Sequence, residues 1–130
     1  EHACIRELSP YVDVVVSEAS VDAMMDIYAS SLFSIGERLH ANVLSAAAGT
    51  PFISLGYRPK CYDFAESLQY EMFYVQLDMA TMPLLSTMVD RLIDRYDRQR
   101  RKLAENVACY RALLREKAEY VMNEVQHGIS

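Results

Sequence analysis

The chain lacks any long apolar run. No stretch of its 130 residues approaches the roughly 18 consecutive apolar residues that a membrane-spanning helix needs. It also lacks the P-loop and Gly-x-Gly-x-x-Gly loops that bind nucleotide phosphates, and the Gly-x-Ser-x-Gly turn that presents a nucleophilic serine. These absences weigh against a transmembrane segment and against the enzyme classes that those motifs mark.

Cysteine and positive charge are both scarce. The three cysteines (Cys4, Cys61 and Cys109) are odd in number, far apart and in no metal-ligand spacing, so we predict a reduced, cytoplasmic chain without a metal site. The formal net charge is -5, which should repel nucleic acid. We therefore expect no nucleic-acid partner, and any anion site must be a local positive patch.

What the sequence does contain is typical of one soluble α/β domain, with 52% hydrophobic and 24% charged residues. Short β-branched or apolar runs alternate with helical patterns, which is typical of βαβ units and a parallel sheet. The predicted strands are residues 11–17, 32–35, 52–55 and 73–75. The predicted helices are the end of one at 1–8, then 21–28, 38–48, 61–68, 84–96 and 99–125. The fold class we predict is α/β: a three-layer α/β/α, Rossmann-like domain with about four parallel strands and a long C-terminal helical tail.

Two of the predicted strands end in glycine and lead into a helix. Gly36 is followed by Arg38 and His40, and Gly56 is followed by Lys60. The carboxyl ends of parallel strands share one edge of the sheet, where open α/β proteins bind their ligands. Helix starts there also offer unpaired N–H groups. The spacing therefore predicts a site for a small anion, a phosphate or a carboxylate.

Each of these ionisable residues also has a simpler interpretation. His40 is the only histidine inside the α/β pattern and could exchange a proton near neutral pH, or it could pack on the inner face of its helix. Arg38 could grip an anion with its guanidinium or form an ion pair with Glu37 or Asp63. Lys60 could add a point charge or be an ordinary exposed lysine. The sequence leaves these alternatives open.

Several motifs in a fixed order resemble the C-terminal half of polysaccharide pyruvyl transferases. They are GERLHA at residues 36–41, an alanine-rich helix to residue 48, GTP at 49–51, YRPK at 57–60 and the Phe-Ala pair at 64–65. The similarity is good over roughly residues 11–76 and loose in the helical tail. The order of the motifs makes the resemblance more specific than Arg-x-His alone would be.

The resemblance implies one half of a two-domain, GT-B-like transferase. Such enzymes move the pyruvyl group of phosphoenolpyruvate onto a sugar as a ketal and release phosphate, during assembly of a cell-surface polysaccharide or exopolysaccharide. Phosphoenolpyruvate is the donor substrate and no further cofactor is expected. The chain begins at Glu1 without an initiator Met and lacks the expected N-terminal half. We therefore expect residues 1–130 to be the donor-binding domain and to be inactive alone.

The resemblance also implies roles for individual residues. Arg38 would hold the phosphate or carboxylate of the donor, and His40 would be the catalytic acid or base. Lys60 would complete the positive cradle. Glu37 would orient Arg38 or act as an alternative acid, while Gly36 and Tyr57 belong to the same substrate-binding motifs. An acid of the missing half could replace His40 in this role.

Other partners and functions stay open. The implied partners are phosphoenolpyruvate, a saccharide acceptor and the absent N-terminal domain, with membrane proximity through lipid-linked acceptors. The helical tail could pair two copies as a homodimer. One alternative function is a GT-B glycosyltransferase domain that uses a nucleotide-sugar. Another is a non-catalytic interaction domain with a vestigial anion pocket.

Overall fold

The computed structural model describes residues 7, 9–14, 16 and 18–128. The chain is mixed α/β, with a short parallel sheet of three strands and a long C-terminal helix. The elements in chain order are η1 (Ser9–Tyr11), α2 (Val21–Ser30), β1 (Ser34–Gly36), α3 (Leu39–Ala47), β2 (Phe52–Gly56), α4 (Pro59–Ser67), η2 (Glu71–Phe73), β3 (Tyr74–Gln76), η3 (Leu77–Met79), α5 (Met82–Asp94) and α6 (Tyr96–Gly128).

The sheet has the order β1-β2-β3 and both pairings are parallel. Gly36 at the end of β1 lies opposite Ser54, and Gly56 at the end of β2 lies opposite Gln76. α3 connects β1 to β2, and α4 lies on the connection from β2 to β3. The two glycines therefore lie at the same edge of the sheet, as the sequence predicted, and each is followed by a helix.

Local sequence explains where the main helices begin and end. The hydroxyl of Ser20 accepts a hydrogen bond from the N–H of Ala23 and caps α2, and Thr81 caps α5 in the same way. α3 ends at Ala47, and after the C-cap Ala48 comes Gly49, which has φ of +76° and donates its N–H to the carbonyl of Ala46. A glycine at this position costs little because it has no Cβ.

β2 runs through the middle of the core. Phe52 and Ile53 point to opposite faces of the sheet, as neighbours in a strand do, and both are fully buried. Aromatic side chains gather around Phe52: the ring centroids of Phe52 and Tyr70 are 4.9 Å apart, and so are those of Tyr70 and Phe73. The other buried core residues are Ala46, Leu68, Val75, Met88, Leu92 and Leu103. The core thus draws on β2, β3 and four helices.

The predicted strand at residues 11–17 is wrong for the part that the structure describes. Tyr11 ends η1, and residues 12–14 and 16 form no strand. Val12, Val14 and Val16 are 43%, 76% and 51% exposed. A β-branched run favours an extended backbone, but it becomes an inner strand only where other elements cover both of its faces. Residues 15 and 17, and all of the predicted helix at 1–8 except Glu7, lie outside the described residues.

β1 is consequently an edge strand. Its residue Ile35 is 47% exposed. The three-strand sheet replaces the expected four strands, and the three-layer, Rossmann-like detail stays a prediction.

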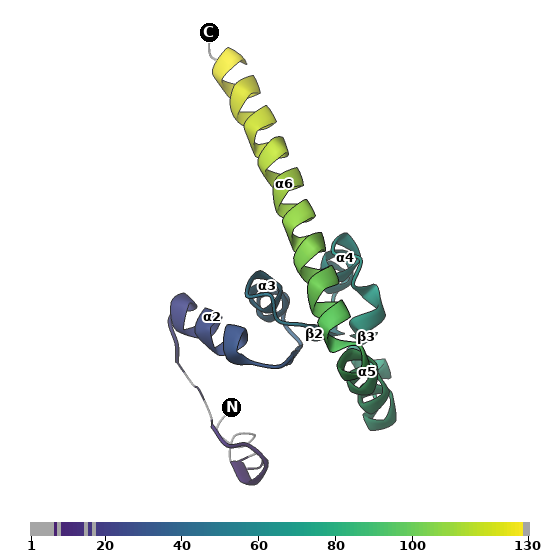
Figure 1. The fold of residues 1–130 in the computed structure, drawn as a ribbon. Helices are drawn as coiled ribbons and strands as arrows, with labels where there is room; N and C mark the ends of the chain where they lie inside the picture. Colours follow the sequence, from purple (N-terminus) through teal and green to yellow (C-terminus); the bar gives the residue numbers. More distant parts are fainter. Residues whose placement is uncertain (1–6, 8, 15, 17, 129–130) are drawn as a thin grey trace.

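α6 differs from every other element in length. Its 33 residues extend well past the rest of the chain (Figure 1). Leu103 near its beginning is fully buried, whereas every residue from 111 to 128 is exposed. No helix in the described part of the chain is both long enough and apolar enough to span a membrane.

Candidate functional site

The two strand-to-helix junctions, residues 36–40 and 56–60, have the same layout. Each begins with a glycine at the end of a strand, and each has an arginine as the N-cap of the next helix: Arg38 for α3 and Arg58 for α4. Two positions later comes His40 in the first junction and Lys60 in the second. The structure thus brings four nitrogen-bearing side chains to one edge of the sheet.

Three of these four side chains have no partner among the described residues. Arg38, His40 and Lys60 are all exposed, and none forms an ion pair or a side-chain hydrogen bond with any described residue. The proposed pairing of Arg38 with Glu37 or Asp63 is therefore not seen, and His40 is not a packed core residue. Arg58 is occupied in part, because its guanidinium carbon lies 5.3 Å from the ring centre of Tyr57.

The backbone of each junction adds hydrogen-bond donors. Neither Arg38 nor Arg58 caps its helix with a side-chain hydrogen bond. In α3 the first amides bonded to a helical carbonyl are those of Ala41 and Asn42, which donate to the carbonyl of Arg38 at 3.1 and 3.3 Å. The N–H groups of the two preceding residues thus come before the first helical hydrogen bond, at the positive end of the helix dipole. This is the usual backbone arrangement for anion binding.

The two glycines are required by different neighbours. A Cβ on Gly36 would lie 2.5 Å from Oδ1 of Asn42, and a Cβ on Gly56 would overlap the ring of Tyr74. Asn42 is fully buried and donates from Nδ2 to the hydroxyl of Ser54 at 2.8 Å. Tyr74 is only partly buried and packs edge-on against Tyr62 at 5.3 Å. Each glycine therefore lets a side chain close over the end of its strand.

Buried polar residues hold the first junction against β2. Oδ1 of Asn42 has no hydrogen-bond partner among the described residues. Nearby, Ser34 donates to the hydroxyl of Ser45 at 2.8 Å, and Ser45 donates to the carbonyl of Thr50 at 3.0 Å. Hydrogen-bonded groups of this kind fix relative positions because leaving them unpaired is costly. They fix α3, and with it His40, relative to the sheet.

A cysteine connects the two junctions. The thiol of Cys61 in α4 lies 3.9 Å from the carbonyl oxygen of Glu37, which precedes the cap of α3. Cys61 is 1% exposed, so it is poorly placed to act as a nucleophile. Its contact instead holds the first turns of α3 and α4 beside each other.

Three residues at these junctions were not among the predicted site residues. Arg58 could have been found from the spacing, since Gly-x-Arg-x-His at 36–40 recurs as Gly-x-Arg-x-Lys at 56–60. Asn42 and Tyr74 had no comparable pattern, because their roles depend on how side chains pack across the sheet. Burial raises the pKa of the Tyr74 hydroxyl, and Cys61 and Asp78 raise it further.

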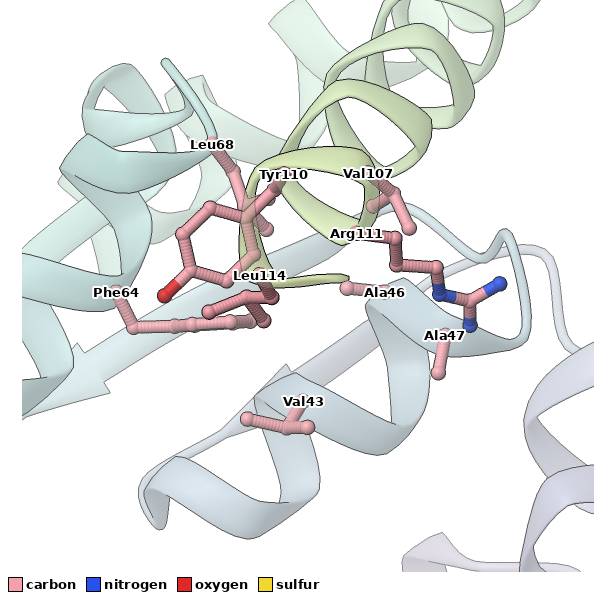
Figure 2. Close-up of a pocket in the computed structure, with 9 residues that line it drawn as sticks. All are labelled: Val43, Ala46, Ala47, Phe64, Leu68, Val107, Tyr110, Arg111 and Leu114. Carbon is pink, nitrogen blue, oxygen red and sulfur yellow. The ribbon is translucent and has the colours of Figure 1, made fainter. Parts of the chain in front are cut away.

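Among the described residues, no group of three or more His, Cys, Asp or Glu side chains could hold a metal ion. An apolar crevice of about 210 Å³ lies away from the junctions, between α3, α4 and α6 (Figure 2). Its lining residues are Val43, Ala46, Ala47, Phe64, Leu68, Val107, Tyr110, Arg111 and Leu114.

Comparison with known proteins bears on the first junction most directly. A family model described as polysaccharide pyruvyl transferase matches residues 2–59. The family resemblance is confirmed for this stretch. The matched range contains Arg38 and His40, ends one residue before Lys60, and leaves out α5 and α6. The chain matches no curated protein and no solved structure. This stretch of the chain is therefore similar to a family described as transferases that act on polysaccharides.

Proposed function

We propose that the two junctions bind phosphoenolpyruvate as the donor wall of a polysaccharide pyruvyl transferase. The observation that carries the proposal is the position of Arg38 and His40. Both lie at a helix start without a side-chain cap, both lack a protein partner, and both fall within the family match. Phosphoenolpyruvate carries a phosphate and a carboxylate, so it needs two anion contacts within a few ångströms of each other.

The residues divide this task between them. Arg38 is suited to a bidentate contact with one anionic group, and the N–H groups at the start of α3 add further donors. Lys60 and Arg58 provide positive charge at the neighbouring helix. Glu37 precedes Arg38 and would orient it, and Tyr57 would form a flat side wall. Gly36 would contribute indirectly, because it leaves room for the Asn42 side chain that holds this junction. No further cofactor takes part in this proposal.

The chemistry requires an acid near the donor. Protonation of the methylene carbon makes the neighbouring carbon electrophilic, and one sugar hydroxyl attacks it. A second hydroxyl of the same sugar then displaces the phosphate and closes the ketal. Of the two hydroxyl protons, one balances the new methyl group and the other leaves with phosphate. In this proposal His40 supplies the first proton, with Glu37 as the alternative acid of this chain.

The acceptor requires a second wall. All the proposed contact residues except Gly36 are exposed at one open edge of a small sheet. We infer that a further domain, in a GT-B-like arrangement, covers this edge and holds the saccharide. The chain described here would then bind the donor but would not complete the transfer alone.

Calorimetric titration of the 130-residue chain with phosphoenolpyruvate tests the proposal. We expect Arg38→Ala and His40→Ala each to weaken binding by about tenfold, since a charge-assisted hydrogen bond contributes about 1.5 kcal/mol or more. Arg100→Ala, which removes an exposed arginine of α6, is the control and should change nothing.

Three outcomes count against this function. Equal binding by wild type and both variants would move the site elsewhere. No binding by the wild type would show that this wall does not hold the donor by itself. Tight binding of a nucleotide-sugar without phosphoenolpyruvate binding would favour a glycosyltransferase.

A further inference from the structure

One face of α6 carries a continuous line of apolar residues, which we call the apolar stripe. Its members follow each other at intervals of three or four positions and so share one side of the helix. They are Leu103, Val107, Tyr110, Leu114, Ala118, Val121 and Val125. The stripe is the feature that links the core to the far end of α6.

The two halves of the apolar stripe have different surroundings. Leu103 is fully buried, and Val107 and Tyr110 pack against the core. Leu114, Val121 and Val125 are 48%, 56% and 52% exposed, although they continue the same face. A surface helix gains most of its stability from packing such a face. The second half of the stripe therefore presents an apolar surface that no described part of the chain covers.

The charges beside the stripe indicate what covers it. Lys117 and Glu124 lie seven positions apart, hence two turns apart on the same flank of the stripe. Two identical helices that pair antiparallel bring the same flanks together. If their two-fold axis passes between residues 120 and 121, Lys117 of each copy lies opposite Glu124 of the second copy. In a parallel pair, neither residue would face the other.

The other flank is compatible with this arrangement. It carries Arg111 and Arg115, and the same axis places Arg115 opposite Gln126 of the second copy. No like charges meet on either flank. The overlap runs from residue 113 to residue 128 in each copy, which is roughly 24 Å of helix. It uses only the part of α6 in which every residue is exposed.

The apolar crevice between α3, α4 and α6 lies at one end of the same surface. Leu114 belongs both to the crevice and to the apolar stripe, and Figure 2 shows it beside Phe64. In the antiparallel arrangement the last turn of the second copy's helix reaches the level of Leu114. The second copy would therefore cover the mouth of the crevice as well as the stripe.

We propose that this chain forms an antiparallel homodimer through the apolar stripe of α6. Sedimentation velocity of the 130-residue chain over a range of concentrations tests it. The wild type should associate to a dimer, and Val121→Arg should abolish association because it places a charge in the centre of the interface. Asn123→Arg adds the same charge on the opposite face of the helix and should leave the dimer intact.

Charge reversal tests the orientation. Lys117→Glu and Glu124→Lys each turn two attractive contacts into two repulsive ones, and should raise the dissociation constant about tenfold at low salt. The double variant restores opposite charges and should return the constant to the wild-type value. At concentrations well above each dissociation constant, circular dichroism should show the same helix content in the charge variants as in the wild type, since both side chains are exposed.

The proposal has clear ways to fail. A wild type that stays monomeric at the highest concentration would overturn it and assign the stripe to another protein or domain. Equal effects of Val121→Arg and Asn123→Arg would show that the stripe is not the interface. If the double charge variant dimerised as weakly as the single variants do, the antiparallel arrangement would be excluded.

Discussion

The two strand-to-helix junctions share a layout but are supported by different neighbours. Behind the first, Asn42, Ser45 and Ser54 are buried polar residues. Behind the second, the ring of Tyr74 closes over Gly56, and Tyr62 packs against that ring. The first junction is thus held by buried hydrogen bonds and the second by aromatic contacts with a partly exposed ring.

This difference predicts unequal rigidity. Asn42 is fully buried and bonded to Ser54, so it has little freedom to move. Tyr74 is partly exposed and can turn toward solvent at small cost. The first junction, which carries the catalytic candidate His40, should therefore keep its geometry more strictly than the second.

The largest expected effect on stability comes from adding a methyl group to Gly36, and the same change at Gly56 provides the comparison. We expect Gly36→Ala to reduce the free energy of unfolding by about 3 kcal/mol, because Asn42 cannot move without losing its bond to Ser54. Gly56→Ala should cost only about 1 kcal/mol, since the ring of Tyr74 can swing aside. Urea unfolding monitored by circular dichroism measures both values.

A double variant checks the cause of the larger loss. In Gly36→Ala combined with Asn42→Ala the added methyl group no longer meets an amide, so the two losses should sum to more than the loss of the double variant. Strictly additive losses, or a larger loss for Gly56→Ala than for Gly36→Ala, would contradict the polar-versus-aromatic distinction.

The sequence predicted the two strand-to-helix junctions well. Its predictions failed where the structure of a segment depends on whether other elements pack against it. In the sequence, Gly36 and Gly56 already indicate where two strands end. Because the strands are parallel, both glycines lie at one edge of the sheet. Residues 11–17 have a strand-like composition, but a local pattern does not show whether other elements will pack against the segment. Asn42 looked like an ordinary helix residue for the same reason. Its importance depends on contacts with Gly36 and Ser54 that form only when α3 packs on the sheet.

The second prediction compares the two arginine caps. Arg38 has no protein partner, whereas Arg58 stacks on Tyr57. Arg38→Ala should therefore weaken phosphoenolpyruvate binding about tenfold, a loss of about 1.5 kcal/mol, and Arg58→Ala should cost less than about 1 kcal/mol. Calorimetry of both variants beside Lys60→Ala ranks the contributions. A larger loss for Arg58→Ala would move the centre of the donor site to α4.

The smallest expected effect concerns the other buried polar atom without a partner, the hydroxyl of Tyr70, which lies in the aromatic half of the core. Burial raises the pKa of Tyr70 above its ordinary value near 10. The backbone of Phe52 lies close enough to lower that pKa in part, but its geometry gives no hydrogen bond with the hydroxyl. Tyr70→Phe removes this hydroxyl without breaking a bond and should stabilise the fold by up to about 1 kcal/mol.

The pH dependence of Tyr70→Phe gives a second measure. In the wild type, Tyr70 stays neutral in the folded state above pH 10 while it ionises in the unfolded state. The contribution of the neutral hydroxyl to the free energy of unfolding is complete below pH 10, and it is lost as the pH rises further. Tyr70→Phe should therefore lose less stability between pH 10 and 11 than the wild type. Tyr120→Phe, at an exposed position of α6, should follow the wild type. Identical curves for all three proteins would show that the hydroxyl of Tyr70 is hydrated or hydrogen-bonded in the folded state.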